Sequence, residues 1–452
     1  MIFSGVVWLG ARHLFDELTA QRLGSILIAA LLTGLVYLVV APTYGTAAGL
    51  FAAVALLTLP RFFFHAHLAA LDVPVAFGCF ALTFLVWKTV DSEGWAWGLA
   101  WGVVWGLAVG TKLNAILVPI ALIGWFALCR RRPCLVPRVL IMGVTAAVTF
   151  FLTWPWLYYD TQARVIAFAN WFLHHFVVGQ WYFGKWYATP PWHAVLVMLW
   201  AVMPSSVTAL IGLGLLRTLR GHSDGGLAWL LILSFVVSIL PFISGMVPLY
   251  DNERLFMPAF PFLAALAGIG FGAVAKYLVK HSPAAWHSFA RTALPTILAT
   301  LLLAPQSLSM VRLFPHLLSY YSEGVGGLPG ATRLGLETTY WCETFGAALP
   351  YINAHAQTGD VVWSDETYVL WYYQRLGKLR DDLVLIDKAT ETEWPDLPGF
   401  DRADWYIFQY RQTSYGPAGD AYPYLRALER LRPVYELTFQ GIPLMRLYNR
   451  AP

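Results

Sequence analysis

Long apolar runs separated by short polar segments occupy most of the chain. A helix needs about 20 mostly apolar residues to cross a bilayer, so runs of about this length predict transmembrane helices. The runs that predict about ten spans lie at 24–41, 45–60, 73–90, 95–111, 114–129, 138–153, 192–216, 227–245, 256–275 and 292–310. Within 95–111, glycines recur every fourth residue, which predicts a bare helix face that packs tightly against a neighbour.

The pattern changes after residue 310, where short apolar segments alternate with polar turns. Strands are predicted at 360–363, 383–386, 405–408 and, as a pair that turns at Gly441, within 434–448. Helices are predicted near 345–356, 366–376 and 421–431. The fold class expected is an α-helical polytopic membrane protein with a C-terminal soluble α/β domain at 311–452.

Composition supports this division. Of 452 residues, 58% are hydrophobic and only 12% are charged, about half the charge of an average soluble domain. Residues 1–310 contain 17 Lys and Arg with 9 Asp and Glu, whereas the much shorter remainder contains 13 and 17. These numbers exclude a soluble enzyme and a disordered chain. The net charge of +4 is small and dispersed, so no nucleic-acid partner is expected.

Basic residues in short loops predict the orientation, because such loops stay on the cytoplasmic side. Basic clusters follow one another two spans apart, at 130–138, 217–220 and 276–291. They place an outer loop at 154–191, the segment 246–255 and everything after 310 on the outer face. We expect an integral protein of a bacterial inner membrane, with the carboxyl-terminal domain periplasmic or extracellular.

Counting predicted spans back from the cytoplasmic loop at 130–138 places residues 1–23 on the outer face. They form an amino-terminal segment before a transmembrane domain at 24–310. Residues 1–15 are too short to span a bilayer and lack the basic region of a signal peptide. Two readings stay open: the first span inserts with its amino end outward, or the chain begins one helix late.

Ionisable residues near a membrane are costly to place and mark functional sites. One group joins the second and third spans and contains Arg61, His65, His67 and Asp72. Three readings compete for this group: a polar helix end without chemistry, an acid–imidazole site that binds substrate, and a metal site of two histidines and a carboxylate.

Two further groups lie on the predicted outer face. Lys112 and Asn114 form a turn between spans, where the lysine is either an interfacial anchor or an ammonium directed at a lipid phosphate. Asp251, Glu253 and Arg254 precede the ninth span. The guanidinium of Arg254 suits phosphate oxygens, but a local pair with either acid is the alternative.

The outer loop 154–191 is rich in Trp and Tyr and contains His174, His175 and Lys185. Helical spacing over 162–176 predicts a helix on the bilayer surface. The loop is read either as a bare membrane-surface segment or as a lid over a cavity that admits lipid. Together, these groups predict an outer-face cavity with carboxylates, imidazoles and two cations, which suits a reaction on a lipid-phosphate substrate.

At these residues the chain resembles the dolichyl-phosphate-mannose–protein mannosyltransferase family, including bacterial polyprenyl-phosphate-sugar transferases. The segments that carry the resemblance are AQRLGSILIAALLTGLVYLV, GTAAGLFAAVALLTLPRFFFHAHLAALDVPVAF, WGLAVGTKLNAILVP and NERLFMPAFPFLAALAGIG. The resemblance implies a GT-C fold. It also implies inverting transfer of a sugar from polyprenyl phosphate to a protein, lipid or glycan acceptor. No cofactor is expected with certainty, and a divalent cation stays open.

The resemblance also implies roles for single residues. Asp72 matches an acid close to the reaction centre and is the residue we predict to be catalytic. Lys112 matches a lysine near the lipid phosphate, and Arg254 matches the basic residue of an Arg-Tyr-x-x-Pro-like motif, so we predict that these two bind substrate with the other residues of the three groups. This chain reads Arg-Leu-Phe-Met-Pro there. Histidines at positions 65 and 67 are not general to the family.

One feature departs from the family pattern. Family members carry a catalytic-base aspartate in a first outer loop, after a first transmembrane helix, and this sequence shows neither. We therefore expect either a start further upstream or a chain that is inactive as it stands. The alternative functions are a transporter or flippase of lipid-linked saccharide and a non-catalytic relative. A transporter should show matched halves with ionisable groups at mid-membrane, and the sequence has neither pattern.

Overall fold

The computed structural model describes residues 2–130, 135–174, 178–221, 226–245, 247–283, 291–387 and 400–450. The chain folds as two compact units, which we call the helical unit and the carboxyl-terminal unit. The helical unit contains Met1–Val178 and Pro191–Arg312, and the carboxyl-terminal unit contains Gly179–Pro190 and Leu313–Pro452. The loop expected at 154–191 is thus divided between the two units.

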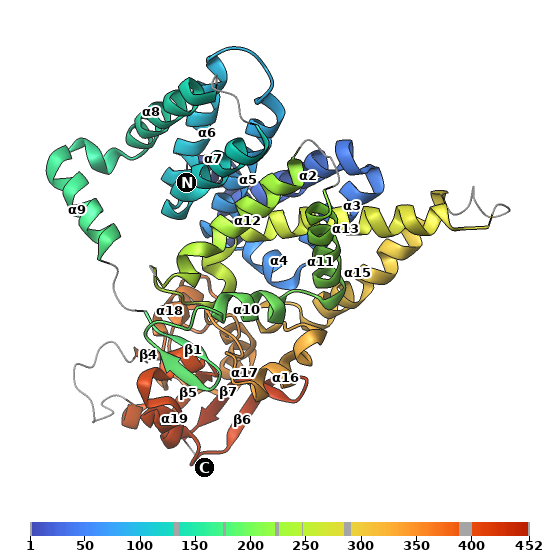
Figure 1. The fold of residues 1–452 in the computed structure, drawn as a ribbon. Helices are drawn as coiled ribbons and strands as arrows, with labels where there is room; N and C mark the ends of the chain where they lie inside the picture. Colours follow the sequence, from blue (N-terminus) through green and yellow to red (C-terminus); the bar gives the residue numbers. More distant parts are fainter. Residues whose placement is uncertain are drawn as a thin grey trace. The chain divides into compact units, whose positions relative to one another are not determined.

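The helical unit is built from helices alone in its described part (Figure 1). Its α-helices are α1 (Ile2–Ala11), α2 (Glu17–Tyr44), α3 (Thr46–Leu57), α4 (Pro60–Ala66), α5 (Asp72–Thr89), α6 (Ala96–Thr111), α7 (Val118–Cys129), α8 (Leu135–Thr153), α9 (Thr161–Leu173), α10 (Ala194–Val202), α11 (Ser205–Leu219), α12 (Leu227–Ile243), α13 (Ala259–Lys280) and α15 (Leu294–Leu313). Short 3-10 helices are η1 (Leu113–Leu117), η2 (Pro155–Tyr158) and η3 (Asn252–Phe256).

Every run expected to span the membrane is helical, but the spans differ in length and straightness. Five described helices are long and apolar enough to cross a bilayer, and the number rises to seven if each of two bent pairs counts as one span. The remaining three runs form shorter apolar helices. The run expected at 192–216 is not one continuous helix, because the chain bends by 120° between α10 and α11. Pro204 lacks an N–H group and holds Met203 in an extended conformation, which ends α10.

The amino-terminal segment contains more structure than its sequence suggested. Helix α1 packs against α2 so closely that a Cβ atom on Gly24 would lie 2.7 Å from the Cα atom of Ser4. The first span also begins earlier than expected, at Glu17. Its start is fixed by Asp16, whose carboxylate accepts a hydrogen bond from the Thr19 amide at 3.1 Å.

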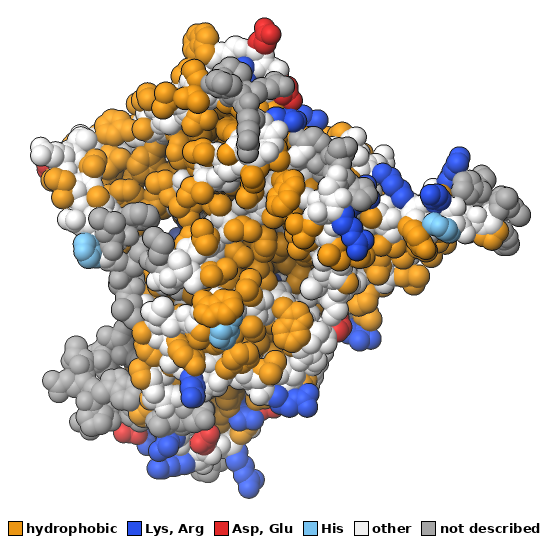
Figure 2. Space-filling model, in the orientation of Figure 1, with side chains coloured by type: hydrophobic (Ala, Val, Ile, Leu, Met, Phe, Trp, Pro, Cys, Tyr) orange, Lys and Arg blue, Asp and Glu red, His pale blue; other side chains and the backbone are white. Residues whose placement is uncertain are grey.

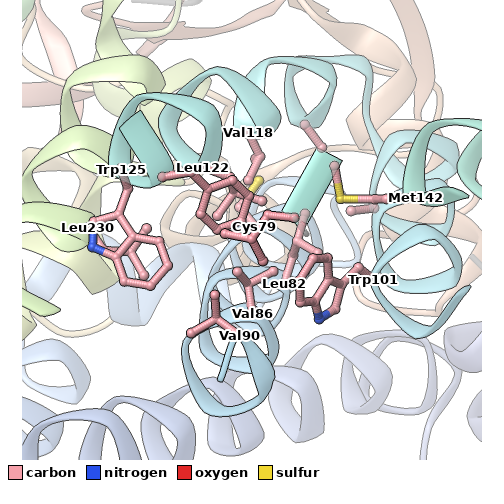
Figure 3. Close-up of a cluster of buried hydrophobic side chains, with 14 of the residues drawn as sticks. Cys79, Leu82, Val86, Val90, Trp101, Val118, Leu122, Trp125, Met142 and Leu230 are labelled. Atoms are coloured by element: carbon pink, nitrogen blue, oxygen red, sulfur yellow. The ribbon is translucent and has the colours of Figure 1, made fainter. Parts of the chain in front are cut away.

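The glycine repeat of α6 packs against α8, as the sequence predicted. A Cβ atom on Gly102 would lie 2.5 Å from the Thr145 Cβ, and one on Gly106 would lie 2.6 Å from the Ala146 carbonyl oxygen. Beside this contact, α5, α6, α7, α8 and α12 enclose a buried apolar cluster (Figure 3). Trp101 and Trp125 are fully buried in it. This cluster fixes α5 and α6 relative to one another, and both have site residues at their ends, Asp72 and Lys112.

The surface of the helical unit is apolar, and Figure 2 shows hydrophobic side chains over its visible face. On α8, Val136, Leu140 and Val144 are 61–68% exposed, whereas Arg138 and Met142 on the opposite side are buried. A helix that exposes its aliphatic side chains and buries its arginine is oriented for lipid rather than for water. The chain is an integral membrane protein.

The carboxyl-terminal unit is a small α/β domain, as predicted. Its five-stranded sheet has the order β4-β3-β5-β7-β6. The strands are β3 (Val361–Ser364), β4 (Val384–Asp387), β5 (Trp405–Gln409), β6 (Pro433–Phe439) and β7 (Ile442–Asn449). β3 pairs in parallel with β4 and β5, whereas β7 is antiparallel to β5 and β6. The turn between β6 and β7 lies at Gln440 and Gly441, both with positive φ angles.

Helices complete this unit, and three of them lie within the predicted ranges: α17 (Leu349–His355), α18 (Thr367–Arg375) and α19 (Pro423–Leu428). A fourth, α16 (Gly327–Arg333), was not predicted. A short hairpin from the distant segment 179–190, β1 (Gln180–Tyr182) with β2 (Lys185–Tyr187), belongs to the same unit. The Gly184 amide donates to the Gly335 carbonyl at 2.9 Å, and the Trp181 amide donates to the Thr413 hydroxyl at 3.0 Å.

Candidate functional site

Asp72 lies at the centre of the candidate site, as the first residue of α5. Its side chain is buried, and each of its oxygens accepts a hydrogen bond from a cation. Lys112 Nζ, at the end of α6, lies 2.5 Å from Asp72 Oδ1, and Arg254 Nε, in η3, lies 3.2 Å from Oδ2. Three residues that the sequence identified separately, up to 182 positions apart, therefore form one cluster.

A sharp turn directs Arg254 toward Asp72. Asp251 and Asn252 both have left-handed backbone conformations, with φ of 52° and 53°. Aspartate and asparagine tolerate this region better than most residues do. The turn lets Arg254 Nη1 donate to Asp251 Oδ2 at 2.5 Å while Nε reaches Asp72. Burial lowers the pKa of Arg254, but the charges of Asp72 and Asp251 outweigh burial and raise it, so the guanidinium stays charged.

Glu253 faces away from Arg254 into the protein. Its side chain has no exposed surface, and Oε2 accepts a hydrogen bond from Arg61 Nη1 at 2.7 Å. His65 Nε2 lies 3.7 Å from the other carboxylate oxygen. Burial raises the pKa of Glu253, but the charge of Arg61 and the hydrogen bond from His65 outweigh it and lower the pKa to about 2. Glu253 thus ties the turn that holds Arg254 to helix α4.

The other residues predicted for the site lie around this centre. Asn114 donates from Nδ2 to the Leu255 carbonyl at 3.1 Å and so joins η1 to η3. The Nδ1 atom of His67 lies 2.7 Å from the Phe63 carbonyl within its own helix turn. Among the described residues, no group of three or more His, Cys, Asp or Glu side chains is placed to hold a metal ion. The metal reading of His65, His67 and Asp72 therefore has no geometric support.

An apolar cavity of about 240 Å³ begins beside Lys112. It is formed by α5, η1, α7, α12, η3 and the start of α13, with one side chain from α9. Its polar lining residues are Lys112, Asn114, Ser234, Ser238 and Tyr250, and the remaining lining side chains are apolar. The cavity thus offers an apolar space that ends at a charged group.

Two lining residues were missed from sequence alone. Tyr250 precedes the acidic turn, and its ring centroid lies 5.8 Å from the Arg254 guanidinium carbon. Its position next to Asp251 was the only available signal. Trp171 lies on α9, where a helix was predicted at 162–176, and it lines the cavity. This contact supports the reading of the outer loop as a cover for a lipid-accessible cavity. His175 lies outside the described residues.

The arrangement can bind a monoanionic or dianionic group. Asp72 and Asp251 balance the charges of Lys112 and Arg254 when no ligand is present. The Lys112 and Arg254 side chains each keep 23% of their surface exposed, whereas Asp72 keeps 2%. The two cations can therefore reach a ligand that Asp72 cannot, and a phosphate is the anion that a guanidinium and an ammonium jointly suit.

Residues 2–159 match the sequence model of the family described as Dolichyl-phosphate-mannose-protein mannosyltransferase, and the match includes Asp72 and Lys112. No curated protein matches the chain significantly.

Solved structures of low sequence identity are similar to the chain over nearly its whole length. ArnT from Cupriavidus metallidurans in the apo state has 17% identity and a TM-score of 0.49, covering 98% of this chain and 87% of that one. The same protein bound to undecaprenyl phosphate has 17% identity and a TM-score of 0.48, again covering 98% of this chain and 87% of that one. The archaeal oligosaccharyltransferase AglB from Archaeoglobus fulgidus gives 11% identity and a TM-score of 0.48, covering all of this chain and 65% of that one.

The family resemblance read from the sequence is therefore confirmed where the family model applies. Over residues 2–159, the chain has the sequence pattern of the dolichyl-phosphate-mannose–protein mannosyltransferase family.

Proposed function

We propose that the chain is a membrane glycosyltransferase that moves a sugar from a polyprenyl-phosphate donor to an acceptor on the outer face. The observation that carries this proposal is the convergence of Lys112 and Arg254 on Asp72 beside an apolar cavity. A polyprenyl phosphate has the two matching parts, an isoprenoid chain for the apolar space and a phosphate for the cations. The family match over residues 2–159 supports the same class of reaction.

The proposed reaction is a single displacement that inverts the anomeric centre. An acceptor oxygen forms a bond to the anomeric carbon while the bond from that carbon to the phosphate oxygen breaks. The acceptor proton passes to a base, and polyprenyl phosphate leaves as the second product. Lys112 and Arg254 stabilise the charge that develops on the departing phosphate, an effect worth about 10²–10³ in rate for one well-placed donor.

Asp72 has a positioning role in this scheme. Both of its oxygens are occupied by the two cations, so its carboxylate holds them in place rather than taking the proton of the acceptor. Asp251 contributes by orienting Arg254. The acceptor is a hydroxyl of a protein, a lipid or a glycan, and the site faces the periplasm or the extracellular side of a bacterial inner membrane.

A direct assay tests the proposal. Purified protein in nanodiscs is incubated with polyprenyl-phosphate sugars, and release of polyprenyl phosphate is measured by mass spectrometry. We expect release from the unmodified chain and losses of on the order of 10²-fold in Lys112→Ala and Arg254→Ala. Lys88→Ala is the matched control, because this exposed lysine lies at the other end of α5. Equal turnover in all three variants would contradict the assigned site.

The runner-up functions make different predictions in the same nanodiscs. A flippase would move the lipid-linked sugar between leaflets without releasing polyprenyl phosphate. A non-catalytic relative would bind the donor and do neither. The described ionisable residues of the site gather at one end of the helices rather than halfway along them, which favours the transferase.

A further inference from the structure

A second pocket lies at the far end of α13 from the candidate site. It has a volume of about 470 Å³ and is lined by the end of α2, the start of α3, the last turns of α13 and the approach to α15. Arg254 lies just before the start of α13, and the helix runs for 22 residues, or about 33 Å. This length matches the hydrocarbon core of a bilayer. The pocket therefore belongs to the opposite membrane face, which the basic loops identify as the inner one.

Three cations surround this pocket. Lys276, Lys280 and Arg291 line it, and no Asp or Glu is among its lining residues. All three side chains are exposed, and none forms an ion pair within the described part of the chain. Three like charges around one pocket repel one another, and an anion bound between them reduces this repulsion.

Helix packing places two of these cations. Gly268, Gly272, Lys276 and Lys280 follow at intervals of four residues and so share one face of α13. A Cβ atom on Gly268 would lie 2.6 Å from the Ala48 carbonyl oxygen, and one on Gly272 would lie 3.0 Å from the Ala48 Cβ. The glycines thus admit the first turns of α3, and the same face continues as lysines beside the start of that helix.

The start of α3 adds uncharged donors to the same wall. Gly45 precedes it with φ of 102°, and no side chain caps it. The first amide bonded within the helix is that of Gly49, which donates to the Gly45 carbonyl at 3.1 Å. The amides of Thr46, Ala47 and Ala48 precede this bond, and these residues line the pocket. A helix start with free amides carries partial positive charge and attracts phosphate groups.

We propose that this pocket binds the phosphate headgroup of an anionic phospholipid in the inner leaflet. The apolar surroundings favour a lipid over a soluble phosphate, because Tyr277 and Leu278 on the same turn are 62% and 38% exposed. Such side chains suit acyl chains next to the headgroup. Basic pockets between transmembrane helices on this membrane face recognise anionic headgroups in general. The site is independent of the sugar donor, since it lies at the other end of α13.

Native mass spectrometry of protein released from mixed phosphatidylcholine and phosphatidylglycerol nanodiscs tests the proposal. The double variant Lys276→Gln/Lys280→Gln should retain on the order of tenfold less phosphatidylglycerol than the unmodified chain. The control is Lys88→Gln/Arg220→Gln, which removes the same charge from the same membrane face without touching the pocket. An equal loss in both double variants would overturn the proposal, because it would show general surface attraction only.

A second variant separates loss of binding from loss of folding. Ala47→Glu puts a carboxylate in the first turn of α3, where negative charge stabilises a helix. We expect an unchanged or raised unfolding temperature together with loss of phosphatidylglycerol. Retained binding in this well-folded variant would overturn the proposal. Titration of inorganic phosphate into detergent-solubilised protein distinguishes the source of the anion. Pocket-dependent phosphate binding without enrichment of phosphatidylglycerol would likewise reject a lipid site.

Discussion

At the residue scale, Asp72 connects two cations that lie on different segments. Replacing it by asparagine removes the charge that both Lys112 and Arg254 need, while the side-chain volume is kept. We expect Asp72→Asn to lower turnover on the order of 10²-fold. Polyprenyl phosphate should bind the variant at least as tightly, because the cations lose an internal competitor. Measuring kcat together with product inhibition checks this split, and a parallel loss of turnover and phosphate affinity would contradict it.

Glu253 should make the stability of the folded chain depend on pH in the acidic range. Its pKa is about 2 in the folded chain and 4.5 as the ordinary value. A lowered pKa stabilises the folded state fully above pH 4.5, and this contribution is lost as the pH falls toward 2. Glu253→Gln removes the carboxylate that pairs with the buried Arg61, and breaking a buried ion pair costs about 3–5 kcal/mol at neutral pH.

Unfolding temperatures in detergent between pH 7 and pH 3 measure both effects of Glu253. The unfolding temperature of the unmodified chain should fall over the acid half of this range. That of Glu253→Gln should be lower at pH 7 and should fall less as the pH is lowered. The double variant Arg61→Met/Glu253→Met is the control, because replacing both partners of a buried pair by apolar side chains is often neutral. A pH profile in Glu253→Gln that parallels that of the unmodified chain would reject this role for the ion pair.

The sequence indicates which residues of the site are unusual but not what each of them contacts. Arg254 has two acids within three positions, and the local pair with Asp251 is present, but Glu253 turns to Arg61 instead. Arg61 lies 192 positions away, and no local pattern reports a contact over that separation. A chemical role could therefore be predicted for single residues from the sequence. Which acid pairs with Arg254 and which with Arg61 could be learned only from the fold.

At the element scale, the glycine face of α6 sets the distance to α8. Gly102→Leu would force its side chain against Thr145 and the Met142 carbonyl, since even a Cβ atom would lie 2.5–2.7 Å from them. We expect a loss of stability of about 1–3 kcal/mol or more. The control is Gly143→Leu on α8, where a Cβ atom meets nothing within 4 Å. Thermal unfolding of the two variants in one detergent should separate them, and equal stability would contradict the packing role.

Helix existence followed from hydrophobic runs, but helix direction depended on single residues. Two runs predicted as spans are bent, by 70° between α3 and α4 and by 120° between α10 and α11. In both pairs a proline begins or precedes the second helix, Pro60 in α4 and Pro204 before α11. A proline marks the site of a break, but the angle across it is set by packing that sequence alone does not reveal.

At the scale of the whole molecule, the basic loops make a prediction about sidedness. Glu93, in the turn between α5 and α6, should face the cytoplasm, and Asp381, in the carboxyl-terminal unit, should face outward. Cysteines introduced at these two exposed positions can be labelled with a membrane-impermeant maleimide. The native Cys79 and Cys342 are buried, and Cys129 and Cys134 are replaced by serine in both variants so that they add no background. Asp381→Cys should react in intact cells and Glu93→Cys only after permeabilisation; the reverse pattern would invert the topology.

The sequence predicts the division of the chain into two units, but it does not predict every segment that each unit contains. The change in charge density near residue 310 predicts a second domain, and its strands fall where alternation places them. The hairpin β1–β2 could not be assigned to that domain in advance. Its aromatic residues read equally well as a membrane-surface segment, and only contacts with Gly335 and Thr413 identify its partner.

The interrupted carboxyl-terminal unit also has a consequence for how the protein is made. Gly179–Pro190 leaves the ribosome long before Leu313–Pro452, the segment with which it folds. At about 5–20 residues per second, synthesis of the intervening and remaining chain takes on the order of ten seconds to a minute. During that interval the hairpin lacks the segments around Gly335 and Thr413 that it contacts in the folded unit. The hairpin therefore reaches its place in this unit only after its partner segment has been made, and a chain that stalls before Leu313 leaves the hairpin without that partner.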